Sequence, residues 1–145
     1  MRESRGTTIL ELMTVVSLAA ILSTIVISNV KALNTPASTA AAAFVGFCKE
    51  ARAKAMASTY AYTVKPASST SIVTTYAKSC TATPQTNDPA LTLPLKQGAR
   101  LSSTNWSFCY STRGLVDSSL DIAIGDTNGT KTVQVGLGGG VRIKP

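Results

Sequence analysis

The longest apolar stretch of the chain lies near its start, where no charged side chain occurs from Leu12 to Val30. At a helical rise of about 1.5 Å per residue this stretch covers roughly 28 Å, close to the hydrocarbon thickness of a bilayer. Arg2 and Arg5 precede it, and only Lys31 follows it directly. The pattern predicts one membrane-spanning helix with a cytoplasmic N-terminus and an exported C-terminal part.

A cleavable secretory signal is the alternative, because it also joins a short basic start to an apolar run. The apolar core of such a signal usually measures about 7–15 residues, and the run from Leu12 to Val30 is longer. No small-x-small cleavage site stands before an obviously polar mature start. The pattern therefore favours a helix that remains in the mature protein.

A second helix is expected after the polar residues Asn34, Thr35 and Pro36, which interrupt the helical pattern. Thr35 can cap a helix and Pro36 can occupy its first position, so a kink or a restart is predicted here. From Ala37 to Ser58 apolar residues recur at helical spacing on one side, which predicts a helix packed against the rest of the domain. This apolar stripe consists of Ala40, Phe44, Phe47, Cys48, Ala51 and Ala55.

The remainder reads as short strands separated by Pro, Gly, Asn and Ser. Several runs alternate between apolar and polar residues, as half-buried strands do. The pair Asn128-Gly129 predicts a hairpin, whereas the proline-containing stretch from Cys80 to Leu101 is expected to be an irregular loop. A helix followed by such strands predicts an α+β fold with an antiparallel sheet. The expected strands are Tyr60–Val64, Ile72–Ala77, Trp106–Tyr110, Leu120–Ile124, Thr132–Leu137 and Val141–Ile143.

Glu11 is the one carboxylate at the head of the apolar stretch. Its insertion costs about 2.5–3.5 kcal/mol unless it lies near the interface or finds a partner. If the chain is cut between Gly6 and Thr7, the new α-amino group of the same or a neighbouring subunit can reach this carboxylate. Such a pair neutralises both charges in an apolar filament core and sets the stagger of adjacent helices. The simpler alternative is a carboxylate at the cytosolic surface.

The run from Arg5 to Met13, RGTTILELM, resembles the type III signal of type IV prepilins and of type II secretion pseudopilins. That family has a short basic leader ending in Gly, an apolar start and Glu at the fifth mature position. Gly6 and Glu11 match these positions, while Thr7 stands where the family usually has Phe. The resemblance implies a pilin-like fold: a long N-terminal helix, transmembrane in its first half, packed on an antiparallel β-sheet domain.

The resemblance also implies how the chain matures. A prepilin peptidase would cut after Gly6 and methylate the amine of Thr7, and Glu11 would serve assembly. Residues 1–6 are then the leader, 7–33 the transmembrane and assembly helix, and 34–145 the periplasmic globular domain. The protein would lie in the bacterial inner membrane before assembly and in a filament with other pilins or pseudopilins afterwards.

The later part of the chain is similar to the GspH/FimT branch of this family, which contains H-type pseudopilins and FimT/FimU minor pilins. The similarity rests on the helix Phe44–Ser58, on FCYSTRG at Phe108–Gly114 and on the ending GGVRIKP. In DNA-uptake minor pilins of this branch a Gly-Arg-x-Arg tail contacts DNA. Here Gly140 replaces the first Arg and Arg142 retains the second.

A DNA-binding role is therefore one hypothesis, and it agrees with the charge. From Asn34 on, eleven basic and five acidic residues leave a net charge of +6, which attracts polyanions. The alternative is a solvated strand end. The candidate contacts, which would bind phosphates without reading sequence, are Arg142, Lys144 and Lys131, with Arg113 and Arg100 as contributors to the same face.

The three cysteines, Cys48, Cys80 and Cys109, allow one internal disulfide. In an oxidising exterior a bridge between Cys80 and Cys109 is favoured over three reduced thiols, and Cys48 on the helical stripe is expected to be a buried free thiol. The sequence has no His, no close carboxylate pair and no phosphate-binding glycine loop before a helix, so neither an enzyme, a metal site nor a cofactor is expected. Asp117, Asp121 and Asp126 lack the further ligands of a calcium loop.

Overall fold

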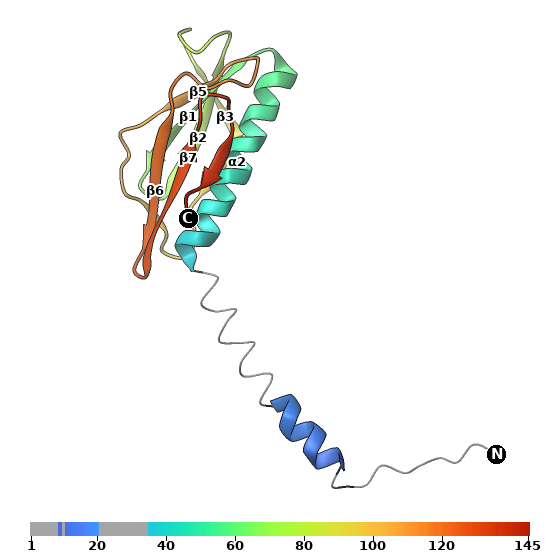
Figure 1. Ribbon diagram of the computed structural model, residues 1–145. Coiled ribbons are helices and arrows are strands. Elements are labelled where there is room, and N and C mark those ends of the chain that lie inside the picture. The colour runs from blue at the N-terminus through green and yellow to red at the C-terminus, as the bar shows by residue number, and fades with distance from the viewer. Residues whose placement is uncertain (1–8, 10, 21–34) are drawn as a thin grey trace, which may run out of the picture. The chain divides into compact units, whose positions relative to one another are not determined.

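The computed structural model describes residues 9, 11–20 and 35–145 (Figure 1). The chain divides into two units, Met1–Asn34 and Thr35–Pro145, which we describe separately. In the first unit residues 9 and 11–20 are helical, and the side chains of Leu12, Val15 and Leu18 are exposed. No helix in the described parts of the chain is both long and apolar enough to cross a membrane. Most of the predicted membrane segment, with Gly6 and Thr7, lies outside these parts.

The second unit begins with helix α2, Pro36–Ser58, which starts where the sequence predicts. Thr35 is the N-cap, and its hydroxyl accepts a hydrogen bond from the amide of Ser38 at 3.3 Å. Pro36 has no N–H to satisfy. The next free amide, that of Ala37, donates to the carboxylate of Asp126 at 2.8 Å. Each early amide of α2 is therefore accounted for.

Two four-stranded antiparallel sheets follow, where the sequence analysis expected one sheet. Their strand orders are β3-β2-β1-β5 and β4-β6-β7-β8. Helix α2 runs along both and contacts strands of each (Figure 1). The strands are β1 Ala61–Ser68, β2 Ser71–Ala77, β3 Thr86–Pro94, β4 Arg100–Leu101, β5 Phe108–Tyr110, β6 Leu120–Asp126, β7 Gly129–Val135 and β8 Val141–Ile143.

The predicted apolar stripe of α2 is confirmed, since all six of its residues are buried. Phe44 is fully buried and packs against the rings of Phe47 and Trp106, at centroid distances of 6.5 and 6.0 Å. Side chains from both sheets, among them Ile72 and Val133, belong to the same core. The stripe is thus the surface that joins the two sheets.

The prediction of an irregular loop from Cys80 to Leu101 is wrong for its middle, which is strand β3, and for its end, which is β4. Strand β3 is the edge of the first sheet, where proline is tolerated. Pro89 falls in a bulge, between Asp88, which pairs with Thr74, and Thr92, which pairs with Val73. The Thr74 hydroxyl donates to the carbonyl of Leu91 at 3.0 Å. The prolines therefore interrupt the ladder where side chains and edge position compensate.

The predicted hairpin is confirmed and joins β6 to β7, with Asp126 paired to Gly129. One carboxylate oxygen of Asp126 accepts from the amides of Asn128 and Gly129, at 2.6 and 2.9 Å. The other oxygen accepts from Ala37 at the start of α2, where a helix dipole favours negative charge. Asp126 therefore closes the hairpin and caps the helix at once.

These amides, above all that of Ala37, hold the pKa of the Asp126 carboxyl below its ordinary value. A depressed pKa stabilises the folded state above the unfolded value of about 3.9, and this contribution disappears as pH falls through the folded pKa. We expect Asp126→Asn to lower the midpoint of urea unfolding near pH 7. Below about pH 4 the difference in midpoint between this variant and the unsubstituted chain should become smaller. Fluorescence of Trp106, the single tryptophan, reports the midpoint. A difference in midpoint that does not change with pH would contradict this role of the carboxylate.

Candidate functional site

Three regions follow from the predicted site residues: the N-terminal helix, the C-terminal strand and the cysteines. The structure adds a fourth, a groove beside α2. In the first, Glu11 lies in the helical residues 11–20 and is exposed. Leu12, Val15 and Val16 beside it each expose about 60% of their surface or more. Such a helix presents apolar side chains that favour burial against a membrane or another helix. Its processing residues, Gly6 and Thr7, are outside the described chain.

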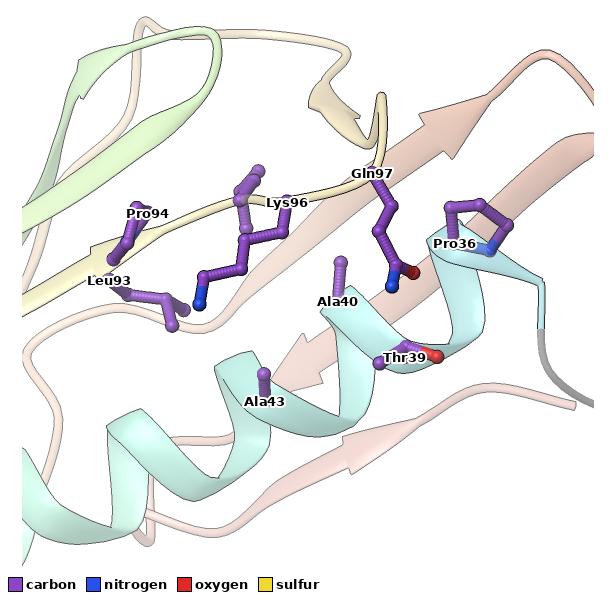
Figure 2. Close-up of a pocket in the computed structure, with 9 residues that line it drawn as sticks. Pro36, Thr39, Ala40, Ala43, Leu93, Pro94, Lys96 and Gln97 are labelled. Atoms are coloured by element: carbon purple, nitrogen blue, oxygen red, sulfur yellow. The ribbon is translucent and has the colours of Figure 1, made fainter.

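An apolar groove of about 390 Å³ lies between the start of α2 and the end of β3 (Figure 2). Pro36, Ala40 and Ala43 form the helical wall, and small side chains there leave the space open. Figure 2 shows Lys96 and Gln97 extending over it from the chain after β3. The lining contains one cationic group and no carboxylate. The groove is therefore better suited to bind an apolar segment than to catalyse a reaction.

The basic C-terminal residues Arg142 and Lys144 lie on β8 and directly after it. The guanidinium of Arg142 donates through Nε and Nη2 to the side-chain carbonyl of Gln134, at 2.9 and 2.7 Å. The ammonium group of Lys144 forms an ion pair with Asp121. Both candidates share the outer side of the second sheet, and both already have polar partners, so an added phosphate would compete with these contacts.

The other three basic candidates lie apart from these two residues. Lys131 alternates in phase with the buried Val133 on β7, so it belongs to the opposite side of the sheet from Gln134. Arg100 lies on β4, at the edge of the sheet farthest from β8. Arg113 follows β5 in a turn. The expectation of one common face is therefore wrong for Lys131. Arg100 pairs with Gly125 of β6 and shares the outer side of the sheet with Arg142, although at the opposite edge.

Cys80 and Cys109 form a disulfide, with Cα atoms 5.7 Å apart and a sequence separation of 29. It is the pairing that the sequence favours. The bond attaches the chain after β2 to strand β5, which pairs with β1. Cys109 is also fixed by its amide, which donates to the carboxylate of Asp117 at 2.9 Å. The disulfide therefore holds the FCYSTRG segment against the first sheet.

Cys48 is a buried free cysteine, as predicted. Burial raises the pKa of its thiol far above the ordinary range, against a smaller lowering effect of the Tyr110 side chain. Because the thiolate is the reactive form, this thiol is inert and structural. Among residues 9, 11–20 and 35–145 no group of three or more His, Cys, Asp or Glu side chains is arranged to hold a metal ion.

Comparison with solved structures places this fold among known ones. The type IV minor pilin FimU of Pseudomonas aeruginosa superposes in two crystal forms, with TM-scores of 0.60 and 0.57 at 14% identity. The matches cover 75% and 74% of this chain, and 88% and 91% of FimU. The minor pseudopilin EpsH of the Vibrio cholerae type 2 secretion system superposes with a TM-score of 0.54 at 15% identity, over 76% of this chain and 97% of EpsH.

No family model matches the sequence, and no curated protein matches it. At 14–15% identity the structural likeness establishes the fold. The prediction of a pilin-like α+β fold, a helix packed on antiparallel sheet, is confirmed, because FimU and EpsH share it.

Proposed function

We propose that the chain is a minor pilin of a type IV pilus, assembled through its N-terminal helix and helping to initiate or cap the fibre. The observation that carries the proposal is the combination of this fold with the register of Gly6 and Glu11 in the sequence. The fold supplies the outer domain, and the leader supplies the means of assembly. An H-type pseudopilin of a type II secretion system is the alternative, favoured by the likeness to EpsH.

In this proposal the precursor lies in the inner membrane with its N-terminus in the cytoplasm. A prepilin peptidase cuts after Gly6 and methylates Thr7, and the mature chain enters a filament with other pilins. Glu11 then pairs with an α-amino group in the apolar core. The role is structural and uses no cofactor, in keeping with the absence of His from the sequence.

Replacing Gly6 by a bulky residue such as Leu should block cleavage, because the peptidase must accommodate the residue before the cut. We expect the precursor, six residues longer, to accumulate on a gel. The matched control is Gly46→Leu at an exposed helical glycine with open space around it, which should mature normally. Normal maturation of Gly6→Leu would overturn the proposal. Deletion strains scored for twitching, DNA uptake and protein secretion distinguish a pilus subunit from a pseudopilin.

DNA capture is a second candidate function, favoured by the +6 charge of residues 34–145 and by the exposed Arg142 on β8. Phosphate contacts of this kind weaken steeply with salt. Arg142→Ala with Lys144→Ala should reduce the DNA affinity of residues 34–145 in a gel shift, by about threefold to tenfold at low salt. The control is Lys65→Ala with Lys78→Ala, two exposed lysines that are not among the candidates, which removes equal charge elsewhere. An equal loss in both pairs would exclude the C-terminal strand as the binding surface.

A further inference from the structure

The groove between the start of α2 and the end of β3 is open to the outside and largely apolar (Figure 2). Its volume of about 390 Å³ is within the usual range of binding pockets, about 300–1,000 Å³. In its helical wall the side chains of Thr39 and Ala43 are exposed, and its other wall contains Leu93, Pro94 and Leu95. Both walls therefore offer apolar surface to a group that enters from outside.

The β3 wall of the groove is also a free sheet edge, because within the described chain β3 pairs only with β2. The amide of Leu95 donates to the carbonyl of Thr70, at 2.8 Å. Backbone groups of alternate residues point toward the partner strand in an antiparallel ladder, so those of Thr92 and Pro94 point away from β2. They are available to an extended segment that adds to the sheet. Pro89 and Pro94 lack an amide donor, so such pairing is short.

The alternation of side chains along β3 connects this edge with the groove. Leu91 and Leu95 are buried and Leu93 lines the groove, so these three side chains lie on the side of the sheet that α2 covers. A strand added at the edge continues the same pleated sheet, and every second side chain of it points to that side as well. Apolar residues at these alternate positions would enter the groove and contact Ala40 and Ala43 of α2. Pairing at the edge and filling of the groove are thus compatible with one extended segment.

Lys96 gives the groove a preference for charge. Its side chain is exposed and extends over the groove beside Gln97 (Figure 2). Among the described residues the ion pairs involve Lys54 and Lys144, so Lys96 has no carboxylate partner there. An apolar site with one unpaired cation at its rim favours a segment that carries a carboxylate.

The turn that carries Lys96 and Gln97 has an unusual backbone. Gln97 has a φ of 61°, a left-handed conformation that is unfavourable for a residue other than glycine. Residues held in this way occur mostly at functional sites and ligand clamps. The amide of Ala99 closes the turn by donating to the carbonyl of Lys96, at 3.2 Å. The strained residue is therefore part of the rim of the groove.

We propose that this groove binds an extended apolar segment with a carboxylate, which belongs to a different subunit of the filament and adds as a short strand to the free edge of β3. Residues 34–145 carry a net charge of +6, so a second copy of the domain is repelled, whereas an acidic segment is attracted. A subunit that initiates or caps a fibre also has unlike neighbours. The inference rests on the proposed function, since it names the chemistry of the partner within that filament and the surface that binds it.

Photocrosslinking of the full chain in cells identifies the occupant. A benzophenone amino acid replaces Thr39 in the groove wall, and in the control it replaces Thr112, an exposed residue of the turn after β5. From position 39 we expect an adduct at least about tenfold above the control, formed with a different subunit that has a prepilin-type leader. Mass spectrometry should place the crosslink in an apolar stretch that contains Asp or Glu. An adduct no stronger than the control, or one formed only within the chain, with a second copy or with a protein that lacks such a leader, would overturn the inference.

Substitutions in the same crosslinking chain test the groove and its charge. Ala43→Phe fills the groove and should reduce the adduct by about tenfold or more, because the incoming segment then meets a steric clash. Ala53→Phe, at an exposed alanine of the same helix outside the groove, should leave the adduct unchanged. Lys96→Glu should also reduce it about tenfold by repelling the carboxylate, whereas Lys78→Glu, at an exposed lysine elsewhere, should not. Equal adducts in each variant and its control would overturn the inference.

The free edge is tested at Thr92. Thr92→Pro removes the amide that points away from β2, whereas Thr92→Ala changes the side chain and keeps this amide. The first should reduce the adduct about threefold to tenfold, as the loss of one hydrogen bond does, and the second should not. Where Thr92→Pro lowers the midpoint of urea unfolding, the substitutions at Ala43 and Lys96 decide. Normal maturation of Gly6→Leu would count against the proposed function alone, whereas a filament subunit without the partner adduct would overturn only this inference.

Discussion

Replacing both Cys80 and Cys109 by Ser is expected to lower the free energy of unfolding by about 3.5 kcal/mol. The bond closes a loop with a sequence separation of 29 residues. A disulfide reduces the conformational entropy of the unfolded chain, and for a loop of this length the chain-entropy model gives a stabilisation of about 3.5 kcal/mol. The loss is large because a small domain has a total stability of only about 5–15 kcal/mol. Strand β5 is also the edge strand of the first sheet and pairs there only with β1.

Urea unfolding of the full chain in mild detergent, followed by Trp106 fluorescence, measures this effect. Reducing agent should bring the unsubstituted chain to the midpoint of the double variant and leave the double variant unchanged. The matched control is Cys48→Ala, which removes the buried free thiol and should keep its full response to reduction. A double variant as stable as the unsubstituted chain would show that the loop is held by other contacts.

The helical parts of the fold follow well from local pattern. Thr35 and Pro36 predict the start of α2, and the six-residue apolar stripe predicts its buried side. These features depend on neighbours within one turn, which sequence displays directly. Strand β3 shows the opposite case. Its prolines argue against a central strand, and only its place at the edge of a sheet, set by pairing with β2, makes them acceptable.

The same distinction applies to the site. The Cys80–Cys109 pair could be favoured because few pairings of three cysteines exist and one thiol lies on the helical stripe. The capping role of Asp126 and the position of Arg52 could not be predicted from the sequence, because each depends on a contact between distant parts of the chain. Asp126 reaches Ala37 over 89 residues, and Arg52 meets two turns from separate segments, those of Gly114 and Gly139. No periodicity in the sequence records such contacts.

The prediction of one DNA-binding surface was incorrect in part, for a related reason. The sequence analysis grouped Lys131 with Arg142 by charge, but the alternation of β7 places them on opposite sides of the second sheet. Arg100 lies on the same side as Arg142, but on β4 at the other edge. Charge composition describes the whole domain, whereas a phosphate-binding surface requires cations on one side. Arg142 and Lys144 remain as candidates. Arg142 is hydrogen-bonded to Gln134, and Lys144 forms an ion pair with Asp121.

Substitution of Gly139 by Ala is the second large effect that we expect, a destabilisation of about 2–6 kcal/mol. Gly139 has a φ of 78°, a conformation that costs a non-glycine residue about 1–3 kcal/mol. Its added Cβ would also clash with the carbonyl oxygen of Gly114 and press on Arg52. Backbone atoms cannot rotate away, so one of the two turns must move, which adds a penalty of the order of 1–3 kcal/mol seen in overpacked sites.

Gly138 provides the matched control, because it precedes Gly139 in the same turn and has open space where its Cβ would lie. Gly138→Ala should change the urea midpoint little, whereas Gly139→Ala should lower it clearly. The displaced turn leads into β8, so Gly139→Ala should also disturb the pairing of Arg142 with Gln134, visible as faster amide exchange of Gln134. Equal stability of the two variants would mean that the Gly114 and Gly139 turns do not enclose the Arg52 side chain as tightly as the structure shows.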